Sequence, residues 1–257
     1  MPQLAFWSWI GVIVAAMLVG YAKTAVNGVA SIAIVIFAAV LPAKESTGTL
    51  LPLLIAGDLM AIWVYRRHAN WSLIARLLPW IFVGLVVGAL FVARVDNHAM
   101  RVAIGVLLLV LLAAQVVSGR RTGSIAPDPA GTEPVDQATH THPLLASAAG
   151  TGTGFATMVA NASGPIMTLY LLASGYAVVE LVGAAAWLFF IVNLIKVPFS
   201  IGLGLLHPGS IALDALLLPA MGLGGWVGAI TISRISRQQF ERYVLVLVTI
   251  SALLLLV

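Results

Sequence analysis

Long apolar runs alternate with short polar segments along most of this chain, and their lengths predict its secondary structure. A helix needs about 20 mainly apolar residues to cross the hydrocarbon core of a bilayer. The runs of about this length are Thr47–Tyr65, Leu73–Val92, Met100–Val117, Leu181–Ile201, Ile211–Ile232 and Phe240–Val257. We therefore predict a full membrane crossing from each of these runs.

Two further apolar stretches contain a polar break. Phe6–Leu41 is interrupted at Lys23–Gly28, and Leu144–Ala173 is interrupted at Asn161–Pro165. Backbone leaves helical geometry inside a membrane only where protein or a water-filled cavity satisfies its N–H and C=O groups. Each stretch is therefore expected to form two short limbs around a polar break, as a re-entrant hairpin that enters and leaves on one side.

One hydrophilic segment divides the chain. Residues 118–142 are rich in Ser, Thr, Gly, Pro and charged residues, which is the composition of a flexible linker. We expect a first transmembrane repeat over residues 1–117, the linker over 118–142, and a second transmembrane repeat over 143–257.

The two halves resemble each other when they are laid side by side. The equivalent positions include Gly20 and Gly154, Asn27 and Asn161, Glu45 and Glu180, Asp58 and Asn193, and Gly84 and Gly224. A hairpin plus three crossings per half is an odd count, which inverts the second half relative to the first. The expected fold is an all-α polytopic membrane protein with two inverted repeats, each a broken hairpin plus three transmembrane helices.

Charge supports a membrane location and a topology. Hydrophobic residues make up 61% of the chain and charged residues only 9%, against roughly 25% in soluble domains. The net charge of +4 comes from basic residues between apolar runs, so it indicates topology rather than nucleic-acid binding. In the inverted arrangement the arginine-rich turns near Arg66 and Arg234 share one side, which we expect to be cytoplasmic. A parallel arrangement with eight crossings separates these turns.

The chain lacks the usual groups for catalysis. It has no cysteine, which removes disulfides, thiolate metal sites and cysteine nucleophiles. It shows no phosphate-binding loop and no dinucleotide fingerprint. His140 and His142 resemble a metal pair but stand in the linker without further ligands. We expect no enzyme activity, no metal and no cofactor.

The polar breaks predict an anion site. A half-helix that begins at a break directs unpaired N–H groups and its positive end into the cavity. Gly28 and Gly164 permit unusual dihedral angles, Ser163 offers a hydroxyl, and the amides of Asn27 and Asn161 offer donors and acceptors. We predict that these residues bind substrate, with capping of the hairpins as the alternative for the two asparagines.

Charged residues inside the apolar segments extend this prediction. Lys23 and Lys196 are expected to supply positive charge, and Asn193 shares a helix face with Lys196. The alternatives are a structural pair of Lys23 with Asp58, and a Lys196 that snorkels to the interface. Asp58 is expected to be the only carboxylate deep inside a full-length run, which makes it either a proton carrier or a helix-packing residue.

Several segments together resemble a known family. They are the broken first helix of each half, Glu45-Ser-Thr-Gly-Thr49 at the entry to the next helix, and Tyr65-Arg-Arg-His-Ala-Asn-Trp71 before a Gly-xxx-Gly helix. Outside the linker, the chain resembles the sulfite exporter TauE/SafE family of membrane permeases. The resemblance implies transport of sulfur oxyanions or small organic anions, such as sulfite, thiosulfate, sulfoacetate or related sulfonates.

The predicted function is a secondary transporter that moves a small anion across the bacterial cytoplasmic membrane, with Asp58 as the candidate proton carrier. An uncoupled anion channel and a transporter of a small carboxylate are the alternatives. The expected partners are the anionic substrate and the lipid bilayer, and a homo-oligomer is compatible with the sequence.

Overall fold

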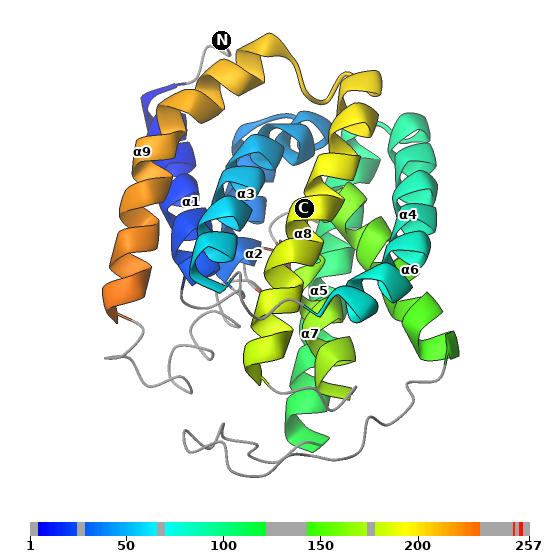
Figure 1. Cartoon of the computed structure of the whole chain (residues 1–257). Coiled ribbons are helices and arrows are strands. Elements are labelled where there is room, and N and C mark those ends of the chain that lie inside the picture. Colours follow the sequence, from blue (N-terminus) through cyan, green and yellow to red (C-terminus); the bar gives the residue numbers. More distant parts are fainter. Residues whose placement is uncertain are drawn as a thin grey trace.

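The computed structural model describes residues 5–24, 29–65, 70–121, 143–173, 178–231, 249, 252 and 253. Helices and no β-strands are found within these residues (Figure 1). The helices are α1 (Phe6–Thr24), α2 (Ala30–Val40), α3 (Ala43–Tyr65), α4 (Trp71–Arg94), α5 (Asn97–Arg121), α6 (Pro143–Ala160), α7 (Gly164–Ala173), α8 (Val178–Gly202) and α9 (Pro208–Thr231).

Six of the described helices are long and apolar enough to cross a membrane, namely α1, α3, α4, α5, α8 and α9. The expectation of an all-helical, multi-pass membrane protein is confirmed. Five of these helices coincide with predicted crossings. Most of the remaining predicted crossing, Phe240–Val257, lies outside the described residues.

The second predicted break lies between α6 and α7 as expected, most of the first lies outside the described residues between α1 and α2, and the first limbs are longer than expected. α1 has 19 residues and α6 has 18, whereas the second limbs α2 and α7 have 11 and 10. The expectation of short limbs was wrong for α1, because no strongly polar residue interrupts its apolar run before Lys23. Each hairpin therefore pairs a long helix with a short return helix.

Packing joins the two halves at two corresponding interfaces. α1 of the first half packs along α9 of the second, and α6 of the second half packs along α4 of the first. α3 packs against α8 between these pairs. In Figure 1, α1, α3 and α9 run in one direction, whereas α4, α6 and α8 run in the opposite direction.

Glycines bring the backbones into contact at both interfaces. A Cβ atom on Gly20 or Gly224 would overlap a backbone carbonyl across the α1–α9 contact, and one on Gly84 or Gly154 would do so across the α4–α6 contact. Small residues of this kind let membrane helices approach closely. The glycines paired by sequence thus occupy equivalent places in the two contacts.

The hydrophilic segment between the halves is only partly described. α5 continues to Arg121, past residue 117 where the linker was expected to begin, and α6 starts at Pro143. Residues 122–142 lie outside the described residues, and His140 and His142 are among them.

Candidate functional site

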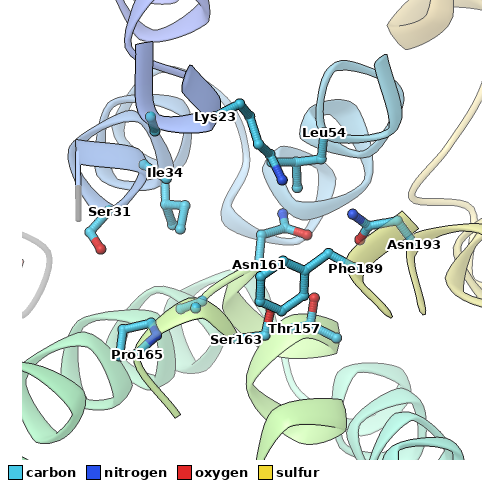
Figure 2. Close-up of a pocket in the computed structure, with 14 residues that line it drawn as sticks. Lys23, Ser31, Ile34, Leu54, Thr157, Asn161, Ser163, Pro165, Phe189 and Asn193 are labelled. Carbon is cyan, nitrogen blue, oxygen red and sulfur yellow. The ribbon is translucent and has the colours of Figure 1, made fainter. Parts of the chain in front are cut away.

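A small pocket lies between the two helix breaks (Figure 2). Its wall combines Lys23 at the end of α1, the first turn of α2, the segment Asn161–Pro165, and Phe189 and Asn193 of α8. Figure 2 shows Lys23, Asn161, Phe189 and Asn193 directed toward one another. The cavity volume is about 50 Å³. That is several times the ~10–15 Å³ needed by one water, so the pocket suits a solute of a few heavy atoms.

The amino ends of both return helices border this pocket. Ala30 and Ser31 begin α2, Gly164 and Pro165 begin α7, and all four line the cavity. The first N–H groups of a helix have no partner within the helix, and this end carries a partial positive charge. The residue before α2, Val29, has no side chain that accepts a hydrogen bond from them. The positive ends of both helix dipoles therefore favour a negatively charged solute in the pocket, although Pro165 itself has no N–H to donate.

Lys23 forms an ion pair with Asp58 of α3. Its stem passes over Gly57, where a Cβ would come within 2.8 Å of Lys23 Cγ. Asp58 is fully buried, and its second carboxylate oxygen accepts a hydrogen bond of 2.7 Å from Asn193 Nδ2 of α8. The Lys23 ammonium also lies 5.6 Å from the centroid of the Phe189 ring, in cation–π range. These contacts tie α1, α3 and α8 together beside the cavity.

Lys196 has a different environment. It is fully buried, so the alternative in which it snorkels to the interface is wrong. Lys196 Nζ donates to the carbonyl oxygen of Thr157 at 2.7 Å and to Asn161 Oδ1 at 2.5 Å. No carboxylate of the described residues pairs with it. The fully buried amino group of Lys196 thus stands directly behind the pocket wall, and its hydrogen-bond partners among the described residues are neutral.

Asn161 positions this ammonium. Its Nδ2 donates to the carbonyl oxygen of Thr47 in α3 at 3.0 Å while its Oδ1 accepts from Lys196. Its φ of 53° lies in the left-handed region, which asparagine tolerates better than most residues. This turn ends α6 and lets α7 start three residues later. In this conformation both polar atoms of the side chain are engaged by protein.

The charges around the pocket do not balance. Lys23 and Lys196 contribute two formal positive charges, and Asp58 contributes one negative charge. A buried charge without a counter-ion is costly. If Lys196 carries its proton, one positive charge is left for an anion to neutralise.

The structure gathers most of the predicted site residues in one place. Lys23, Asn161, Ser163, Gly164 and Asn193 line the pocket. Asp58 and Lys196 lie immediately behind it, each bonded to wall residues. Asn27 and Gly28 lie outside the described residues. The substrate-binding roles of all these residues stay predictions.

One buried carboxylate was missed. Asp58 was expected to be the only carboxylate deep inside a full-length run, and Asp214, near the start of the run Ile211–Ile232, is nevertheless only 2% exposed. α9 begins at Pro208 and places Asp214 within its second turn. The available signal was its position inside the apolar run Ile211–Ile232.

Comparison with known proteins identifies the family. The family model described as "Sulfite exporter TauE/SafE" matches residues 12–255. No curated protein and no solved structure gives a significant match. The family match spans both helix breaks and both glycine interfaces, which agrees with the resemblance seen in the sequence. The chain therefore belongs to the sulfite exporter TauE/SafE family.

Proposed function

We propose that this membrane permease is a secondary transporter that moves a small sulfur oxyanion or organosulfonate, such as sulfite, across the cytoplasmic membrane. The family supplies the general class, permeases for sulfur compounds. One observation carries the anion assignment: the amino ends of α2 and α7 border a pocket beside which Lys23 pairs with Asp58, while Lys196 behind the wall has no carboxylate partner among the described residues.

The pocket suggests how the anion is held. Its oxygens would accept hydrogen bonds from the first turns of α2 and α7 and from the Ser163 hydroxyl, which lies at the wall. Lys196 would supply the balancing charge through the wall. Asp58 stays a candidate proton carrier, because a proton on its carboxylate would free Lys23 to face the anion.

Inverted repeats would give this site access to either side in turn. Three features support them: the opposite directions of α1 and α6, the corresponding α1–α9 and α4–α6 contacts, and the equivalent glycines in those contacts. In such transporters the halves rock about a fixed central site. The pocket lies between the halves, where that motion would open and close it.

Ligand-induced stabilisation tests the anion assignment. Purified protein would be melted with sulfite, thiosulfate, sulfate, sulfonates or small carboxylates, since a ligand that binds only the folded state raises the melting temperature. We expect sulfite or another sulfur anion to raise it, and we expect Lys196→Met to reduce that shift. Lys44→Met is the control, because Lys44 donates to the carbonyl of Val95 away from the pocket.

Flux in proteoliposomes then tests transport. The anions that stabilise the protein should cross the membrane, faster when a proton gradient is imposed. Stabilisation by carboxylates alone would favour the carboxylate transporter, and flux indifferent to the gradient would favour a channel. If no anion changes the melting temperature and none is transported, the proposed function is wrong.

A further inference from the structure

Asp214 is a buried carboxyl group without a hydrogen-bond partner among the residues that the structure describes. It is 2% exposed, and neither of its carboxylate oxygens accepts or donates a hydrogen bond. It sits six residues into α9, about 9 Å along the helix at 1.5 Å per residue. It is therefore inside a membrane-spanning helix and away from the pocket, whose wall does not include it.

The face of α9 that carries Asp214 points into the protein. Ser210, Leu213, Leu217 and Met221 are buried with it, at the spacing of one helical face. The opposite face is exposed, as Ile211, Leu216, Leu218 and Leu223 show. α9 packs on α1 and α3, which are helices of the other half (Figure 1).

The polar groups next to Asp214 along α9 form hydrogen bonds with each other and not with Asp214. Ser210, one turn earlier on the same face, donates to the carbonyl oxygen of His207 and accepts from the His207 N–H. His207 Nδ1 accepts from the Ser210 N–H. The nearest hydroxyl and imidazole along α9 thus hold the start of the helix together.

The helices packed on α9 also leave Asp214 unpaired. Among the described side chains, α1 carries the titratable groups Tyr21 and Lys23, and α3 carries Lys44, Glu45 and Asp58. Lys23 pairs with Asp58, and Lys44 donates to a backbone carbonyl. None of the five bonds to Asp214.

We propose that Asp214 is a second proton-binding site, occupied in this conformation and emptied when α9 separates from α1 and α3. An ionised carboxylate that is buried without a partner is very costly, so this conformation requires the neutral acid. Once the helix contact opens, water would hydrate the group, and the acid would release its proton to that water.

This inference rests on the proposed transport function and adds a coupling element to it. Asp58 and Asp214 are buried carboxyls from different halves, but they differ in charge compensation. Asp58 has an ammonium and an amide as hydrogen-bonding partners. Asp214 has neither, so proton exchange at Asp214 would follow the contact between the halves rather than the occupancy of the pocket.

Stability at different pH tests the site without any transport assay. Raising the pH drives ionisation of Asp214, which the closed conformation cannot accommodate, so wild-type melting temperature should fall from mildly acidic to mildly alkaline conditions. Asp214→Asn mimics the neutral acid. We therefore expect the melting temperature of this variant to decrease clearly less than that of wild type over the same pH range. Ser200→Ala is the matched control, because Ser200 Oγ is also buried and unpartnered but does not titrate.

Flux measurements test the coupling. We expect Asp214→Asn to retain sulfite-induced stabilisation and sulfite exchange but to lose most of the stimulation by an imposed proton gradient. Equal pH dependence of melting in wild type and Asp214→Asn, or undiminished stimulation in the variant, would overturn the inference. Failure of wild type to respond to any anion would instead overturn the proposed function, and the melting comparison would still decide whether Asp214 binds a proton.

Discussion

The two lysines near the pocket are held in contrasting ways. Lys23, in the first half, has the carboxylate of Asp58 as its partner and is 13% exposed. Lys196, in the second half, is fully buried and has only the oxygens of Thr157 and Asn161. The first ammonium is neutralised by the protein, and the second is merely hydrogen-bonded.

This difference shows how a duplicated fold can produce an asymmetric site. Sequence equivalence pairs Asp58 with Asn193, so the half that supplies Lys196 has an amide where the other has a carboxylate. The side-chain amide of Asn193 hydrogen-bonds to Asp58 rather than to Lys196. The uncompensated positive charge therefore belongs to the second half.

Removing the carboxylate of the first pair should have the largest effect. Breaking a buried ion pair by deleting one partner typically costs about 3–5 kcal/mol. We expect Asp58→Ala to lower the free energy of unfolding by about 3 kcal/mol, since Lys23 keeps some solvent contact. The measurement is denaturant unfolding in detergent micelles. Lys23→Met combined with Asp58→Ala should recover part of this loss, and strictly additive costs would contradict the pairing.

Anion affinity should separate the two lysines. Lys196→Met removes the uncompensated charge, and we expect the dissociation constant for the transported anion to rise about 10- to 100-fold, the value of a charge-assisted contact. Lys23→Met with Asp58→Asn removes a neutral pair and should change the dissociation constant much less. Ligand titrations followed by melting temperature or calorimetry measure both. Equal losses in the two variants would refute the charge asymmetry.

The glycine contacts should respond alike in both halves. Gly20→Ala and Gly154→Ala force a Cβ onto a backbone carbonyl of the partner helix, so each should cost about 1–3 kcal/mol. Gly222→Ala is the control, because a Cβ there meets nothing within 4 Å. The decrease in melting temperature relative to wild type measures the effect of all three substitutions. A harmless Gly154→Ala beside a damaging Gly20→Ala would show that the two interfaces are not equivalent.

The left-handed turn at Asn161 should give the smallest effect. Both Asn161→Ala and Asn161→Gly remove the amide that holds Lys196. The alanine variant is destabilised by about 1–2 kcal/mol more, because a Cβ atom is unfavourable at φ 53°. We therefore expect the glycine variant to melt higher than the alanine variant. The opposite order would mean that backbone strain at this turn is relieved in another way.

Local sequence patterns predicted much of the fold and part of the site. Apolar run length predicted five of the six span-length helices within the described residues, and Lys23–Gly28 and Asn161–Pro165 marked the places where helices end. The equivalent asparagines and glycines pointed to a duplicated chain. The length of α1 was also present in the sequence, as the uninterrupted apolar run before Lys23, although we expected a short limb there.

The sequence by itself determined that this chain is a helical membrane protein with two broken segments, because in lipid every backbone group must be satisfied within a helix or by buried protein. Only the tertiary structure decided which charges meet. The Lys23–Asp58 pair, the neutral partners of Lys196 and the isolation of Asp214 depend on contacts between helices far apart in sequence. Helical periodicity places a side chain on a face, but the packing of other helices decides what that face meets.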